Sequence, residues 1–151
     1  MRTDCRLIVD CDFGIESGIY LVQPPHKLDL QSDFDFCGLD YSIENRTLTL
    51  RWRRATGDGA AGNTPASIRL EFREVTEFRF MPRDAEPSFS EDTCVHAFGY
   101  WTDELWTKGQ VFTAVRPETG LPDPDWLTAI SFMSGAIIAI QAASAHARIE
   151  P

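Results

Sequence analysis

Apolar and polar residues alternate with a period of two through much of the middle of the chain. In residues 47–54 (TLTLRWRR), Leu48, Leu50 and Trp52 hold every second position up to Arg53, with threonines and arginines between them. Successive side chains of a β-strand point to opposite faces, so this pattern is typical of a strand with one buried face. We therefore expect the three apolar side chains to face a hydrophobic core.

Two neighbouring segments show the same alternation. Residues 34–43 (FDFCGLDYSI) precede a polar turn at 44–46, which predicts an antiparallel pair with 47–54. Past a glycine-rich loop at 55–65, residues 67–80 (SIRLEFREVTEFRF) are expected to form a further strand with a slip near Glu74 and Val75. The side chains expected on its inward row are Ile68, Leu70, Phe72, Phe78 and Phe80.

Shorter signals occupy the flanks of this region. The runs CRLIVD (5–10) and SGIYLV (17–22) are expected to be two short strands, and the prolines of QPPH (23–26) break the chain after them. Residues 88–97 are the best helix candidate. Ser90 is the expected N-cap, and Glu91 and Asp92 suit the positive end of the helix dipole.

An uncharged stretch of 18 residues, 126–143 (WLTAISFMSGAIIAIQAA), lies near the end of the acidic chain. Its polar residues and acidic flank do not match a membrane helix, which needs about 20 predominantly apolar residues and basic flanks. Gly135 favours a turn at Ser134-Gly135 between two antiparallel strands, 127–133 and 136–149. The alanine-rich tail QAASAHAR has good helix propensity, so a buried helix is the alternative.

These patterns together predict one domain spanning residues 1–151. The length suffices for a single sizeable core, and an aromatic content of 11% argues against disorder. We expect a mainly β fold, either an antiparallel sandwich or a curved half-barrel, with one short helix.

Charge and cysteine spacing narrow the classes of partner. With 23 acidic and 14 basic residues, the net charge is −9. This charge repels phosphate backbones, so we expect no nucleic-acid partner, whereas a basic protein partner is electrostatically permitted. The cysteines at positions 5, 11, 37 and 94 lack the spacing of zinc or redox sites, and the N-terminal apolar run is too short for a signal peptide. We expect free, mostly buried thiols in a cytoplasmic protein.

Several short motifs that mark catalytic or metal sites in other proteins occur here without the accompanying residues that such sites need. Residues 12–14 spell the DFG of protein kinases without a glycine-rich loop or an HRD motif. Asp pairs at 10/12, 33/35 and 123/125 offer carboxylates to Mg²⁺ or Ca²⁺ but lack further ligands at fixed offsets. The three histidines, His26, His96 and His146, lie far apart in the sequence. We expect no metal, no cofactor and no catalytic residue.

Residues 96–109 (HAFGYWTDELWTKG) are the most suggestive of a binding site. Tyr100, Trp101 and Trp106 lie beside Asp103 and Glu104. Tyr and Trp bury large areas while keeping a polar atom, which makes them frequent at binding hot spots. The neighbouring acids would receive a basic partner. The alternative is that both tryptophans cap the core.

Three stretches resemble small bacterial β-rich proteins, some of which are immunity proteins of polymorphic toxin systems. The stretches are LDYSIENRTLTLRWRR, then ASIRLEFREVTEFRFMPRD, then ISFMSGAIIAIQA followed by ARIE, and they cover roughly residues 34–150. The shared features are a hairpin, an L-x-F-x-x-V-x-x-F segment and a closing strand pair around a Ser-Gly or Asp-Gly turn. The resemblance implies a β-rich toxin-blocking protein and brings no catalytic residues with it.

Three functions of different classes follow from these observations. The first is a non-enzymatic cytoplasmic binding protein of the immunity type, which occludes a basic partner. The second is a β-barrel that binds a small molecule or lipid through its apolar side chains. Those side chains are Phe34, Phe36, Trp52, Phe78 and Phe80. The third is a small enzyme in which Cys94, His96 and an acid converge. The oligomeric state is left open.

Overall fold

In the computed structural model, the described residues are 4–5, 10–56, 63–102 and 125–151. Of these residues, 59% lie in strands and none lies in an α-helix, so the mainly β fold is confirmed. The strands are β1 (Asp4–Cys5), β2 (Asp10–Cys11), β3 (Gly14–Glu16), β4 (Tyr20–Gln23), β5 (His26–Asp29), β6 (Phe34–Ser42), β7 (Thr47–Arg54), β8 (Ser67–Arg73), β9 (Glu77–Met81), β10 (Val95–Trp101), β11 (Leu127–Phe132), β12 (Ile137–Gln141) and β13 (Ser144–Glu150). A 3-10 helix of five residues, η1 (Phe89–Thr93), precedes β10.

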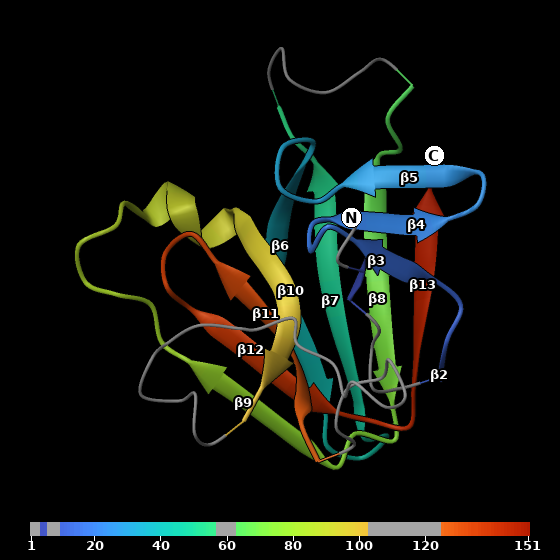
Figure 1. Ribbon diagram of the computed structural model, residues 1–151, viewed down its shortest axis with the longest axis vertical. Coiled ribbons are helices and arrows are strands. Elements are labelled where there is room, and N and C mark those ends of the chain that lie inside the picture. The colour runs from blue at the N-terminus through green and yellow to red at the C-terminus, as the bar shows by residue number, and fades with distance from the viewer. Residues whose placement is uncertain (1–3, 6–9, 57–62, 103–124) are drawn as a thin grey trace.

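The strands form three sheets, none of which closes on itself (Figure 1). The largest sheet has the order β2-β13-β8-β7-β6 and is antiparallel except where β2 pairs with β13. A second sheet has the order β10-β11-β12-β9, and a small N-terminal sheet has the order β1-β3-β4-β5. One hydrophobic core contains residues from all three sheets, which join in a single packed body.

Two strands of the largest sheet continue into the second sheet after a bend. β8 leads into β9, and β13 follows β12, so that the same two chain segments pair in both sheets. Hydrogen bonds from Ala143 N to Arg73 O (3.0 Å) and from Thr76 N to Gln141 O (2.9 Å) carry the pairing across the bend. The strands of the two larger sheets thus form a bent, open half-barrel.

The bend corrects one strand expected from the sequence. The single strand over 136–149 is wrong because the chain turns at 142–143, and its two halves pair in different sheets. The hairpin that begins this strand is confirmed. β11 pairs antiparallel with β12, and Gly135 in the turn between them has a φ of 89°, a conformation that glycine adopts without strain.

Burial explains both the alternating apolar pattern of β7 and β8 and the continuous apolar run of β11. The inward residues of β7 and β8 alternate with exposed or half-buried ones, as expected. All six residues of β11 are buried, because the second sheet has a hydrophobic cluster on each face. A strand covered on both faces has no position where a charged side chain reaches water, which accounts for the uncharged run near the end of the chain. In the described part of the chain, no helix is long and apolar enough to cross a membrane.

The helix expected over 88–97 is wrong. The chain forms only the short η1 there, and from Val95 it becomes β10, which pairs with β11. Ser90 is not the N-cap; Ser88 holds that position without a side-chain capping hydrogen bond. The apolar residues Val95 and Phe98 gain more from strand pairing and burial than a short, poorly capped helix provides.

Candidate functional site

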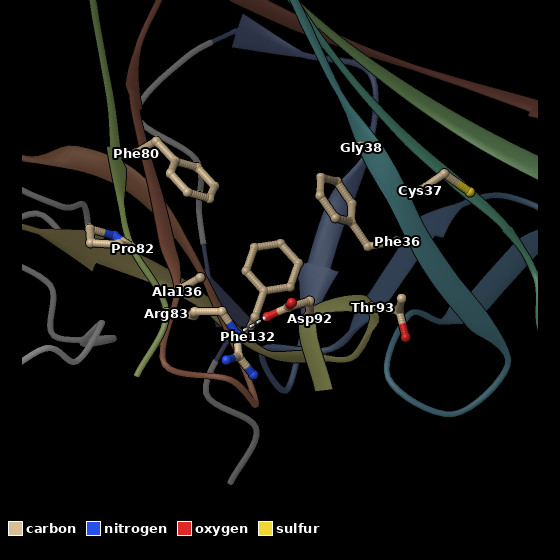
Figure 2. A pocket seen from close by; sticks show the side chains of 10 residues that line it. All are labelled: Phe36, Cys37, Gly38, Phe80, Pro82, Arg83, Asp92, Thr93, Phe132 and Ala136. Atoms are coloured by element: carbon tan, nitrogen blue, oxygen red, sulfur yellow. Dashed lines mark hydrogen bonds and ion pairs between the residues drawn. The ribbon is translucent and has the colours of Figure 1, made fainter. Parts of the chain in front are cut away.

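A cavity of about 430 Å³ opens between the edge strands of the two larger sheets (Figure 2). β6 is the edge of the five-stranded sheet, and β9 is the edge of the second sheet. The lining is mainly apolar, with a small polar group at one side. Its residues are Phe36, Cys37, Gly38, Phe80, Pro82, Arg83, Asp92, Thr93, Phe132 and Ala136.

A β-bulge shapes the β6 side of the cavity. The register between β6 and β7 shifts between Phe36 and Gly38, so Cys37 is an extra residue in β6. Gly38 has a φ of 141°, which side chains rarely allow. At the other end of β6, Tyr41 contacts Phe78 of β9 with ring centroids 5.6 Å apart. Strands β6 and β9 therefore touch at the Tyr41 end of β6. They are separated at the bulge, and the cavity lies in the space between them there.

Three phenylalanine rings form the apolar part of the cavity. Phe36 and Phe132 lie with their centroids 4.8 Å apart, and Figure 2 shows Phe80 across the opening from Phe36. Behind this wall, Phe36 packs edge-on against Trp52 of the core at 5.1 Å. Phe80 is 55% exposed, which is unusual for a side chain of this size on a strand. The cavity therefore presents aromatic surface to solvent.

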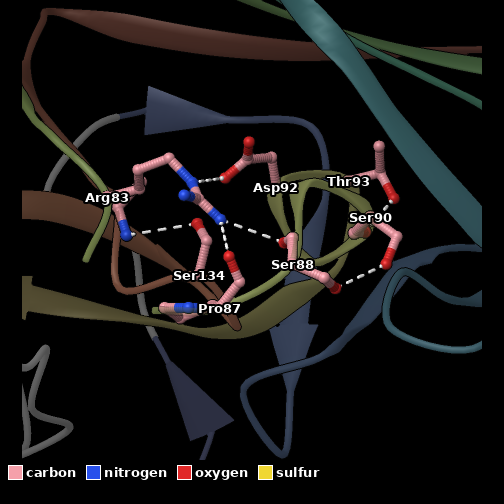
Figure 3. Close-up of polar contacts among 8 residues, drawn as sticks. Arg83, Pro87, Ser88, Ser90, Asp92, Thr93 and Ser134 are labelled. Atoms are coloured by element: carbon pink, nitrogen blue, oxygen red, sulfur yellow. Dashed lines mark hydrogen bonds and ion pairs between the residues drawn. The ribbon is translucent and has the colours of Figure 1, made fainter. Parts of the chain in front are cut away.

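Arg83 organises the polar side of the cavity (Figure 3). Its Nε donates to Asp92 Oδ1 at 2.9 Å, and its Nη2 donates to the carbonyl oxygens of Ser88, at 3.0 Å, and Pro87. The hydrogen bond from Arg83, and a second one from Ser134, lower the pKa of Asp92 below its ordinary value. Asp92 is therefore ionised at neutral pH, and the Arg83–Asp92 pair contributes no net charge to the cavity.

The residues expected to bind a partner lie elsewhere. Tyr100 and Trp101 are on β10 and are buried, Tyr100 in the main core and Trp101 in the cluster on the opposite face of the second sheet. This is the core placement that the sequence left as the alternative for Trp101. Asp103, Glu104 and Trp106 lie outside the described residues. Partner binding by this segment stays a prediction.

The set of apolar residues expected to face a ligand is divided. Phe36 and Phe80 line the cavity. Phe34 and Trp52 are buried in the core, and Phe78 is half-buried against Tyr41. Phe80 lies opposite the core residue Ile138, on the inward row as expected, but β9 is a sheet edge and leaves that ring exposed.

Cys11, Cys37 and Cys94 are free, but for these three the expectation of mostly buried thiols is wrong. Cys11 and Cys37 are exposed and Cys94 is half-buried. Burial, with help from nearby acids, raises the pKa of the Cys94 thiol, and its Sγ donates to the carbonyl oxygen of Gln31 at 3.7 Å. A raised pKa lowers the thiolate fraction at neutral pH, which is the reverse of what a nucleophile needs.

His96 has a hydroxyl neighbour, as its Nδ1 lies 3.3 Å from Ser131 Oγ. The Ser131 hydroxyl donates to the carbonyl oxygen of Ala97 at 3.2 Å, so this pair is part of the β10–β11 packing. Across the described ranges, no group of three or more His, Cys, Asp or Glu side chains is placed to hold a metal ion. The Asp pair at 123/125 falls partly outside those ranges.

Three comparisons with known proteins, against family models, curated proteins and solved structures, gave no match. The resemblance to immunity proteins thus stays a prediction from the quoted residues.

Sequence reasoning missed Phe132, Arg83 and Asp92 as residues of one site. Arg83 and Asp92 lie close in the sequence, but Phe132 lies forty positions further on and joins them only because β9 and β11 belong to the same sheet. One signal was present in the sequence. Alternation in residues 34–43 breaks at Cys37-Gly38, and a glycine that interrupts a strand pattern indicates a bulge.

Proposed function

We propose that this chain is a non-catalytic binding protein whose ligand is a small, mainly apolar molecule bearing an aromatic ring. The observation that carries the proposal is the cavity between β6 and β9, with its three phenylalanine rings. Ligand sites are typically concave, apolar and equipped with a few polar groups at defined positions. This cavity has that composition.

Size and charge narrow the class of ligand. A volume of about 430 Å³ lies near the lower end of the range for ligand pockets, which is about 300–1,000 Å³. It suits a molecule of one or two rings better than a long acyl chain. Since Arg83 and Asp92 neutralise each other, the site favours a ligand without net charge.

The two edges favour a small molecule over an added strand of a protein partner. β6 carries a bulge at Phe36–Gly38, and Pro82, directly after β9, has no backbone N–H to donate. Bulges and edge prolines are devices by which proteins prevent pairing with another chain. Addition of a strand from a protein partner at these two edges is therefore less supported than binding of a small molecule between them.

The proposal is tested with Prodan, an uncharged fluorescent dye with two fused aromatic rings, titrated into the purified full chain. Phe80→Ala removes one ring of the cavity, and we expect it to weaken probe binding by about tenfold, which is equivalent to roughly 1.4 kcal/mol. Thr93→Trp places a large side chain in the lining and is expected to block binding. The control is Ile43→Ala, because Ile43 is 81% exposed and does not line the cavity.

Each result decides the proposal. Equal weakening by Phe80→Ala and Ile43→Ala would show that the probe binds exposed apolar side chains in general, and the proposal would fail. Binding that survives Thr93→Trp, in a variant with an unchanged amide NMR spectrum away from the cavity, would also overturn it. Native mass spectrometry of the untreated protein then identifies any molecule that co-purifies.

A further inference from the structure

The outer face of the five-stranded sheet carries a row of three arginines. Arg148 of β13 lies directly opposite Arg69 of β8, and Arg69 lies directly opposite Arg51 of β7. Adjacent strands are about 4.8 Å apart, so the row spans roughly 10 Å. Like charges directly opposite each other destabilise a sheet. The sheet's own stability therefore does not account for this row.

The arginines of this face differ in whether an acid neutralises them. Arg51 forms an ion pair with Asp40, and the Nε of Arg73 lies 2.6 Å from Glu71 Oε1. Neither of these two arginines is therefore free to neutralise a second anion fully.

Arg69 and Arg148 are exposed, and within the residues the structure describes, neither has an ion-pair partner. Arg53 is exposed on the same face, one strand away and diagonal to Arg69, and it too has no ion pair among those residues. Asp35 lies directly opposite Arg53 on β6 but forms no ion pair with it, so Arg69 and Arg148 form the centre of this group. In a chain in which acids outnumber bases 23 to 14, neighbouring cations without an ion pair are unexpected.

We propose that Arg69 and Arg148, with Arg53 beside them, bind a compact multivalent oxyanion of the phosphate class. A guanidinium group presents several N–H donors in a planar fork that matches phosphate oxygens. Two such forks directly opposite each other hold one dianion between them, and the anion relieves the repulsion between the two cations. This site lies on a different face from the β6–β9 cavity and does not depend on the function proposed for that cavity.

The surroundings of the row favour a compact anion over a nucleic acid. Glu150 follows two residues after Arg148 and is held by a hydrogen bond from Ser67 Oγ (3.4 Å), and Glu71 lies on the other side of Arg69. At physiological ionic strength the Debye screening length is about 8 Å, so charges farther apart than this interact only weakly. A small anion between the arginines experiences mainly their charge, whereas a long polyanion extends over the flanking acids.

The test uses inorganic phosphate on the full chain. Thermal unfolding is followed in sodium phosphate and in sodium chloride at matched ionic strength and pH, across a series of concentrations. We expect a saturable rise of the unfolding temperature in phosphate that chloride does not give. Arg69→Gln and Arg148→Gln should each weaken the apparent phosphate affinity by about tenfold, the loss of one charge-assisted hydrogen-bonding group. In dilute chloride, neither variant should unfold at a lower temperature than the wild type.

Arg46→Gln is the control, because it removes the same charge from an exposed turn residue away from the row and leaves no acid unpaired among the residues that the structure describes. It should keep the phosphate effect. Equal responses to phosphate and chloride in the wild type would overturn the proposal, as would an Arg46→Gln variant that loses the effect to the same extent as Arg69→Gln. Tighter binding of a single-stranded oligonucleotide than of phosphate at the same ionic strength would overturn the assignment to a compact anion.

Discussion

The centre of the five-stranded sheet and the β6–β9 cavity use apolar residues in opposite ways. The open side of that cavity, formed by Phe36 and Phe80, is called the mouth below. At the centre, Leu50 of β7 and Leu70 of β8 are fully buried and have a paired strand on each side. At the mouth, Phe36 and Phe80 lie on strands paired on one side only, and Phe80 remains 55% exposed. Apolar area at the centre stabilises the fold, whereas at the mouth it is left accessible to a ligand.

The largest expected effect separates these two roles directly. Leu70→Ala should lower the free energy of unfolding by about 2–5 kcal/mol, because it removes buried methyl groups and leaves a cavity. Phe80→Ala should cost less than about 1 kcal/mol, although it removes a larger side chain, since most of that ring is in water already. Urea denaturation monitored by circular dichroism measures both. Comparable losses would mean that the mouth is part of the stabilising core, and the comparison would break down.

A second variant tests the hairpin that borders the mouth. Gly135 has a φ of 89°, and a Cβ at this position would collide with the carboxylate of Asp84. Gly135→Ala should therefore destabilise the fold by about 1–3 kcal/mol, through backbone strain and this collision. The double variant Gly135→Ala/Asp84→Ala removes only the collision, so it should recover part of the loss. No recovery would assign the whole cost to the backbone conformation.

Local patterns were sufficient to predict the centre of the molecule. The alternation in 47–54 and in 67–73 reports burial on one face, and it places Leu48, Leu50, Ile68 and Leu70 correctly because both strands lie inside a sheet. The turn at Ser134-Gly135 was likewise predictable, since it depends on the conformational range of one glycine.

The mouth and its neighbours were not predictable in this way. Whether Phe80 is buried depends on β9 being a sheet edge, and that is decided by pairing with β12, more than fifty positions away in the sequence. Residues 88–97 carry helix-start signals, but pairing with β11 turns Val95 and the residues after it into a strand. Long-range pairing overrode local propensity at both places.

The smallest expected effect concerns the pH dependence of the polar side of the mouth. In the folded protein, the hydrogen bonds from Arg83 and Ser134 lower the pKa of Asp92 below its unfolded value. The stabilisation from ionised Asp92 is therefore complete above the unfolded value, near pH 4, and is lost as the pH falls through the folded value. Asp92→Asn should cost at most about 1 kcal/mol at neutral pH, the upper end for solvent-exposed ion pairs. The difference between wild type and variant should shrink below about pH 4 in urea titrations across the acid range. If the difference in unfolding free energy between wild type and variant stays constant to the lowest pH at which the protein is folded, Asp92 acts through its shape and hydrogen bonds alone. The charge of Asp92 would then not stabilise this side of the cavity.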